Sequence, residues 1–207
     1  MSRQAISHNS QLKTTEGHRA VFLDRDGTIS EEVGYLDSIE RLRLIPGSAL
    51  AIKLLNERGL KAVVVTNQSG VARGFFSESR LQEVHEELER RLRKEGAHLD
   101  GIYYCPHLPG DGNEPYLGVC DCRKPASGLL FQAAADLGLD LRASYMIGDH
   151  YSDVECAQRV GAKGILVLTG HGGEAVAEKE SWLSPPAYIA TDLYAAVQWV
   201  IGHVEKG

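Results

Sequence analysis

Short apolar runs alternate with longer amphipathic stretches along most of the chain. Six runs have the length of buried strands, and they cover residues 20–24, 61–66, 102–105, 144–149, 164–169 and 187–191. Five stretches have helical spacing, and they cover residues 46–59, the segment from Ser77, residues 128–138, the segment from Ser152 and residues 193–204. This alternation predicts an α/β fold, a doubly wound parallel sheet with helices on both faces.

The stretch after Ser77 shows the helical pattern most clearly. Leu81, Val84, Leu88 and Leu92 recur at helical spacing, while Glu and Arg fill the other positions. Ser77 is expected to cap the helix at its start. The charged positions are interpreted as a solvated outer face and not as a binding surface.

The chain of 207 residues is expected to form a single domain over residues 19–207, preceded by a polar tail over residues 1–18. The tail lacks the apolar segment of a secretory signal, and no apolar run is long enough to span a membrane. With 22 basic and 28 acidic residues, the net charge is −6. Neither nucleic acid nor a membrane is therefore expected as a partner. Because the tail carries no export signal, a cytoplasmic location is predicted, and the protein is expected to be a monomer. Local charge, and not this net value, decides whether an anionic substrate can bind.

Two carboxylates follow the first predicted strand. Asp24 ends that strand and Asp26 lies two residues further, just before Gly27. The carboxyl ends of parallel strands face the crevice where such sheets bind ligands. Two neighbouring carboxylates can act there as a nucleophile or metal ligand and as a general acid and base. A solvated Asp-Gly turn is the alternative.

Further polar residues follow later strands or occupy loops. Thr66 ends the second strand and could help to hold a phosphate, and Lys124 could place a positive charge beside a developing oxyanion. Asp149 and Asp153 follow the fourth strand and could hold a hard divalent cation. Each also has a structural interpretation, as a cap, a surface lysine or a turn residue. Their order along the chain favours the functional interpretation.

Four segments of the chain resemble the four motifs of the haloacid dehalogenase (HAD) superfamily of phosphohydrolases. In chain order they are DRDGT, TN, K and GD-x(3)-D. The resemblance implies that Asp24 attacks phosphorus to form an aspartyl-phosphate and that Asp26 acts as acid and then base. It implies that Thr66 and Lys124 stabilise the transferring phosphoryl group. It also implies Mg²⁺ held by Asp24, the main-chain carbonyl of Asp26 and Asp149, with Asp153 in support.

A cysteine-rich loop interrupts the strand–helix alternation. The loop supplies four potential metal ligands, the number that closes a structural zinc site. They are Cys105, His107, Cys120 and Cys122. Unpaired thiols, or a redox pair at Cys120 and Cys122, are the alternatives. Cys156 lies far along the chain in a predicted helix and is interpreted as a small buried side chain.

The same loop, residues 105–122, ends next to Arg123 and Lys124. Zinc bound in the loop would therefore position both basic side chains. No insertion is long enough for the cap domain that the superfamily often carries, so short loops are expected to shape the pocket.

The C-x-H and C-x-C-R-K-P segments resemble the heptose-1,7-bisphosphate 7-phosphatase family, and the histidinol-phosphate phosphatases share this signature. The long interval within the loop favours the heptose family. Its activity would be removal of the 7-phosphate of a heptose 1,7-bisphosphate, on the way to nucleotide-activated heptose and the lipopolysaccharide core. Histidinol-phosphate hydrolysis is the alternative, and a non-catalytic phospho-ligand-binding module is the second.

This narrower resemblance also implies which residues contact a phosphorylated sugar. They are Glu32, Val33, Gly34, Tyr35, Asn67, Gln68, Ser69, Arg73, Arg123 and His150. Ser30 stands where the family usually has Asn, and His150 where it more often has Lys. His150 is interpreted either as a substrate contact or as a solvated turn residue.

Overall fold

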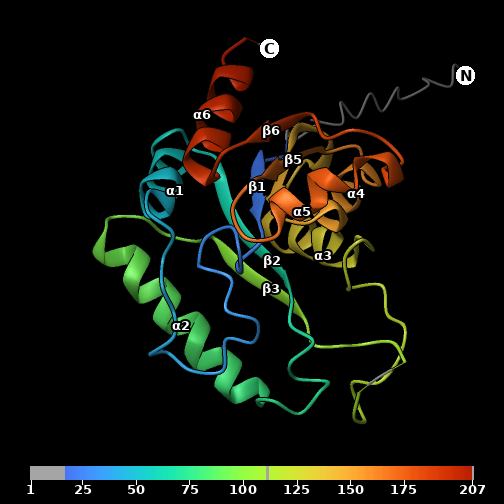
Figure 1. Ribbon diagram of the computed structural model, residues 1–207. Helices are drawn as coiled ribbons and strands as arrows, with labels where there is room; N and C mark the ends of the chain where they lie inside the picture. The colour runs from blue at the N-terminus through green and yellow to red at the C-terminus, as the bar shows by residue number, and fades with distance from the viewer. Residues whose placement is uncertain (1–16, 111, 207) are drawn as a thin grey trace, which may run out of the picture.

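The apolar runs form one parallel sheet of six strands in the computed structural model, which describes residues 17–110 and 112–206 (Figure 1). The strands are β1 (Ala20–Leu23), β2 (Lys61–Asn67), β3 (Gly101–Cys105), β4 (Tyr145–Gly148), β5 (Lys163–Val167) and β6 (Tyr188–Ala190). Their order is β3-β2-β1-β4-β5-β6, so the direction of winding reverses between β1 and β4. The predicted doubly wound fold is confirmed, and the reversal marks the edge where such sheets carry their sites.

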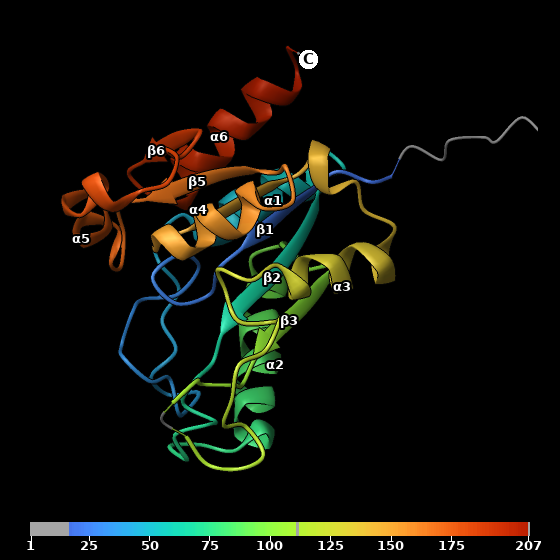
Figure 2. The same cartoon turned by 90° about the vertical axis from the view of Figure 1, so that its right-hand side faces the viewer.

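Helices cover both faces of this sheet (Figure 2). The helices are α1 (Ser48–Glu57), α2 (Glu78–Lys94), α3 (Gly128–Leu137), α4 (Tyr151–Gln158), α5 (Gly172–Ala177) and α6 (Leu193–Val204). Val21 and Leu23 of β1 pack in one core with α1, α2 and α6, while Ala20 and Phe22 pack in a second core with α3 and α4. This alternation of side chains between two faces is the period of a strand buried on both sides.

The helix boundaries agree closely with the sequence pattern. Ser77 caps α2, since its side-chain oxygen accepts a hydrogen bond from the main-chain nitrogen of Arg80 at 3.2 Å. The helix predicted from Ser152 begins one residue earlier, at Tyr151. The short helix α5 was not predicted, because its six residues are too few to show a helical period.

The predicted tail lies almost wholly outside the described residues, which begin at residue 17. His18 already belongs to the fold, since its main-chain nitrogen donates to the carbonyl of Gly138 at 2.9 Å. Its own carbonyl accepts from the main-chain nitrogen of Asp140, also at 2.9 Å. In the part of the chain that the structure describes, no helix has the length and apolar character needed to cross a membrane.

The loop between β3 and α3 folds back onto the segment between β2 and α2. The main-chain nitrogen of Asn113 donates to the carbonyl of Ala72 at 2.7 Å. The hydroxyl of Tyr116 donates to the carboxylate of Glu78, at the start of α2, at 2.8 Å. Among the described residues no inserted domain covers the sheet edge. Loops, the ends of the strands and the first turn of α4 form that edge.

The contact between β5 and α4 leaves no room for a side chain at Gly164. A Cβ atom there would lie 2.7 Å from the Cα of Val154. We expect Gly164→Ala to lower the free energy of unfolding by about 1–3 kcal/mol, because the helix must move away from the sheet. Denaturant titration measures this change. Gly202→Ala in α6 is the matched control, since its Cβ would meet open space; it should be neutral or slightly stabilising. Equal effects of the two substitutions would contradict this packing.

Candidate active site

A cavity of about 400 Å³ opens at the carboxyl ends of the strands. Asp24 directly follows β1, and its main-chain nitrogen still bonds to the carbonyl of Ile147 in β4 at 2.9 Å. Its carboxylate is thereby held at the point where the winding of the sheet reverses. The cavity is lined by Asp24, Asp26, Glu32, Gly34, Tyr35, Thr66, Asn67, Gln68, Ser69, Gly70, Arg123, Lys124, His150, Ser152 and His171.

Lys124 places a buried ammonium beside Asp24. Its Nζ lies 3.0 Å from Oδ2 of Asp24 and 2.6 Å from Oδ1 of Asp153, and it donates to the carbonyl of Val65 at 2.8 Å. The lysine side chain is 2% exposed. Burial opposes its positive charge, but the two carboxylates outweigh this effect and raise the pKa of Lys124. Lys124 therefore remains charged.

Asp149 is held at both oxygens. Oδ1 lies 2.9 Å from Nδ1 of His150, and Oδ2 accepts from the main-chain nitrogen of His171 at 2.8 Å. Gly27 packs so tightly against this carboxylate that a Cβ would lie 2.0 Å from Oδ2, and its φ is +73°. Glycine is required there on both counts.

Three carboxylates and one imidazole converge beside the cavity. Each of these four side chains offers one ligand atom, and the four atoms all lie within 4.8 Å of one another. The side chains are those of Asp24, Asp149, His150 and Asp153. Burial, and then the neighbouring carboxylates Asp153 and Asp26, raise the pKa of Asp24 against the effect of Lys124. The hydrogen bond with Asp149 raises the pKa of His150 to about 9. Three buried carboxylates carry more negative charge than Lys124 and a protonated His150 offset, so this group has the oxygen ligands and the negative charge that suit a divalent cation.

Asp26 has different surroundings from Asp24. Arg25 binds its carboxylate at both oxygens, with Nε 2.9 Å from Oδ1 and Nη2 2.6 Å from Oδ2. The side-chain amide of Gln68 donates to Oδ2 of Asp26 and to the hydroxyl of Thr66, both at 3.0 Å. Burial raises the pKa of Asp26, but Arg25 and Gln68 outweigh it, and the pKa lies below its ordinary value.

The structure brings most of the predicted site residues to this cavity. Asp149 and Asp153 lie behind its wall, in contact with His150 and Lys124 respectively. Val33 and Arg73 are not among the lining residues, although both were expected to touch substrate. The carbonyl of Val33 instead accepts from Nη2 of Arg41 at 2.9 Å.

Several residues of the site were not predicted. Gly70, Ser152 and His171 line the cavity, and Arg25 holds Asp26 from inside the protein. His171 follows β5 by a few residues, so its place after a strand end was a usable signal. Arg25 lies within the DRDGT segment, but no spacing rule shows that its side chain turns inward.

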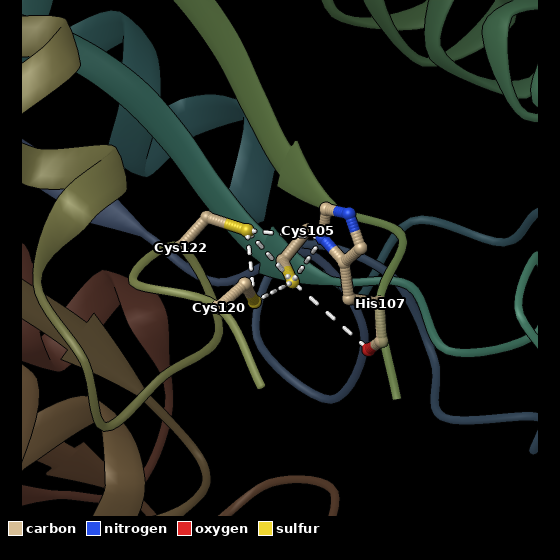
Figure 3. Close-up of side chains that lie close together, drawn as sticks. All are labelled: Cys105, His107, Cys120 and Cys122. Carbon is tan, nitrogen blue, oxygen red and sulfur yellow. Dashed lines mark hydrogen bonds between the residues drawn. The ribbon is translucent and has the colours of Figure 1, made fainter. Parts of the chain in front are cut away.

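The four predicted zinc ligands meet at the base of the loop (Figure 3). The sulfur of Cys122 lies 3.1 Å from that of Cys105, 3.2 Å from that of Cys120 and 3.3 Å from Nδ1 of His107. A tetrahedral zinc site with bonds of about 2.3 Å has ligands about 3.8 Å apart, so a modest expansion of this cluster accommodates the ion. All three cysteines are free thiols in the structure.

Burial affects the thiols of this cluster unequally. It raises the pKa of Cys105 above the ordinary range and that of Cys122 to about 11. The pKa of Cys120 is lowered, because the hydrogen bonds from the two neighbouring thiols outweigh its burial. The thiols of Cys105 and Cys122 therefore keep their protons until a cation takes their place, and a zinc ion bound by all three cysteines would hold them as thiolates.

The cluster is linked directly to the cavity through Arg123. Nη1 of Arg123 donates to the carbonyl of His107 at 3.3 Å, and Arg123 also lines the cavity. The next residue, Lys124, is fixed by its main-chain nitrogen, which donates to the side-chain oxygen of Asn67 at 3.0 Å. The loop therefore holds Arg123, while Asn67 at the end of β2 holds the main chain of Lys124.

Comparison with known proteins places this geometry in a family. Residues 121–196 match the model of a family described as HAD-hydrolase-like. The chain is similar to the D-glycero-D-manno-heptose-1,7-bisphosphate 7-phosphatase of Thermosynechococcus vestitus, at 43% identity over 89% of this chain and 96% of that protein. It is 46% identical to the D-glycero-beta-D-manno-heptose-1,7-bisphosphate 7-phosphatase of Haemophilus ducreyi, over 80% of this chain and 91% of that protein.

A solved structure shows the same similarity. The D,D-heptose 1,7-bisphosphate phosphatase of B. bronchiseptica, in complex with magnesium and phosphate, superposes with a TM-score of 0.80. It is 32% identical to this chain, and the match covers 89% of this chain and 99% of the other. The chain therefore belongs to the heptose-1,7-bisphosphate 7-phosphatase family of HAD-like hydrolases.

Proposed function

We propose that this protein is a phosphatase that removes the 7-phosphate of D-glycero-D-manno-heptose 1,7-bisphosphate, in the synthesis of nucleotide-activated heptose for the lipopolysaccharide core. The observation that carries the proposal is the single cavity that joins Asp24, Asp26, Thr66 and Lys124. The names of the relatives, at 43% and 46% identity, support the substrate.

In the first step Asp24 attacks phosphorus. A bond forms between a carboxylate oxygen of Asp24 and phosphorus, and the bond from phosphorus to the sugar oxygen breaks. Asp26 gives its proton to that leaving oxygen. Asp26 has a lowered pKa in this structure, and the negative charge of an arriving phosphate favours the protonated form that this step requires.

In the second step water releases the phosphate from Asp24. Asp26, now ionised, takes a proton from water, which attacks phosphorus and returns the carboxylate of Asp24. Lys124 and Thr66 offset the negative charge that spreads over the phosphoryl oxygens in both steps. Lys124 is already in contact with Asp24, so it needs no rearrangement to do so.

Asp24, Asp149 and the main-chain carbonyl of Asp26 would hold Mg²⁺, with Asp153 in support. When bound, Mg²⁺ supplies the positive charge that lets a carboxylate approach a phosphate. The carboxylate oxygens that Asp24, Asp149 and Asp153 offer lie within 4.8 Å of one another, which supports this assignment.

Around the cavity, polar and aromatic side chains would hold the sugar. Arg123 and His150 offer positive charge, and Glu32 and Asn67 offer hydrogen-bonding groups. Zn²⁺ held by the cysteine and histidine cluster would fix the loop that carries Arg123. The three cysteines of the cluster are free thiols and not disulfides, and thiols persist in a reducing compartment. This supports a cytoplasmic enzyme. We further propose that residues 19–207 act as a single domain and as a monomer.

Kinetics with two purified substrates test the proposed function. With Mg²⁺ present, kcat/KM for heptose 1,7-bisphosphate should exceed that for histidinol phosphate by at least about tenfold, since binding groups placed for one substrate are left unpaired by the other. A higher kcat/KM for histidinol phosphate would establish the alternative function. Hydrolysis of neither substrate would favour a non-catalytic phospho-ligand-binding module.

A matched pair of variants tests whether this cavity produces the activity. Asp26→Asn should lower turnover by about 100-fold or more, because the acid and base is lost. Asp136→Asn makes the same chemical change on the exposed side of α3, where Asp136 only accepts a hydrogen bond from Tyr103 among the contacts of the described residues. It should leave turnover unchanged. Equal turnover of the two variants would contradict the role of Asp26.

Metal analysis tests the zinc site separately. Protein purified without chelator should contain about one zinc ion per chain, and Cys120→Ser should lose it, because only three ligands remain. Cys156→Ser is the matched control: Cys156 is buried in α4 beside the carbonyl of Ala126, outside the cluster. Absence of zinc from the unmodified protein, or its loss from both variants, would contradict the assignment.

A further inference from the structure

A histidine interrupts the buried face of α2. His85 lies between Val84 and Leu88 on the side that packs against the sheet, and it is 2% exposed. Its Nε2 lies 3.2 Å from Nη1 of Arg25, and its ring lies 5.7 Å from that of Tyr104. A guanidinium only donates hydrogen bonds, so Nε2 accepts and the ring proton is on Nδ1. His85 is therefore a neutral acceptor for Arg25.

Each side-chain nitrogen of Arg25 has at least one hydrogen-bond acceptor. Its side chain is fully buried, and its donors reach both oxygens of Asp26, the side-chain oxygen of Gln68 at 2.9 Å and His85. Arg25 and His85 are absent from the residues that line the cavity. Their effect on a substrate can therefore pass only through Asp26 and its neighbours.

We propose that Arg25 and His85 are positioning residues for proton transfer by Asp26. This inference rests on the acid and base role of Asp26 in the proposed function. A bidentate pair fixes both the distance and the plane of a carboxylate. The carboxylate of Asp26 keeps its orientation toward the leaving oxygen only while the guanidinium of Arg25 stays in place. Nε and Nη2 of that guanidinium bind Asp26, and His85 holds the remaining nitrogen, Nη1.

An apolar side chain at position 85 would break this chain of contacts. Nη1 of Arg25 would become a buried charged donor without its acceptor, and such a group turns toward another acceptor. The carboxylate of Asp26 would turn with it, since the pair is bidentate. Proton transfer is sensitive to changes of this size, because donor and acceptor must lie within hydrogen-bond reach.

The choice of leaving group separates this role from a merely structural one. The sugar oxygen of heptose 1,7-bisphosphate is a poor leaving group and needs a proton, whereas p-nitrophenolate leaves without one. The parameter kcat/KM reports the steps up to loss of the leaving group. His85→Leu should lower kcat/KM for heptose 1,7-bisphosphate by about tenfold or more, and that for p-nitrophenyl phosphate by less than about threefold.

Two amide variants test the position of the acceptor. The side-chain oxygen of Gln reaches the place of Nε2, whereas that of Asn reaches only the place of Nδ1. His85→Gln should preserve the ratio of the two kcat/KM values, and His85→Asn should lower it as His85→Leu does. If His85→Leu fails to fold, this pair decides the matter. Val84→Ala, which removes buried methyl groups from the same helix, should leave the ratio unchanged.

Two results would overturn the inference. One is an equal loss of kcat/KM for the two substrates in the folded His85→Leu or His85→Asn variant. The other is a ratio for His85→Gln no better than that for His85→Asn. Failure of the proposed function gives a different result, seen in the unmodified protein. If the unmodified protein prefers histidinol phosphate, the proposed substrate is wrong. The position 85 variants are then compared with histidinol phosphate, which also has a poor leaving group, in place of heptose 1,7-bisphosphate.

Discussion

A buried lysine makes the rest of the site possible. Carboxylates taken out of water cost several kcal/mol each unless a positive charge lies beside them. The ammonium of Lys124 contacts Asp24 and Asp153 and is 2% exposed, so it offsets much of this cost at the centre of the sheet edge. The negative charge that remains, with Asp149 included, is what suits the cluster to a divalent cation.

A second buried cation gives the neighbouring carboxylate a different character. Arg25 pairs with Asp26 at both oxygens, and the pKa of Asp26 is lowered, while burial and like charges raise the pKa of Asp24. Two carboxylates two residues apart are thus distinguished by their surroundings and not by their type. A nucleophile must be ionised and an acid must be protonated, so these two pKa values must shift in opposite directions when the site is filled. A divalent cation would lower the pKa of Asp24, and the negative charge of a bound phosphate would raise that of Asp26.

The sequence predicted those parts of the site that follow from the sheet itself. Asp24, Thr66 and Asp149 follow apolar runs, and the ends of parallel strands must meet at one edge. The ligands of the loop followed from their spacing and chemistry. Packing between distant segments could not be derived in this way. The contact between Arg25 and His85 joins residues far apart in sequence, and its one signal was a polar residue within an apolar stripe.

The central claim is that Asp24 forms a covalent bond to phosphorus. The stereochemical course at phosphorus tests it most directly, with a substrate whose 7-phosphate is replaced by a thiophosphate that carries 16O and 18O in a known configuration and is hydrolysed in 17O-labelled water. Attack by Asp24 followed by attack by water gives two inversions, so the released thiophosphate, which carries sulfur and all three oxygen isotopes, should show net retention of configuration. Net inversion would show that water attacks the substrate directly, and it would contradict the role of Asp24 as the nucleophile.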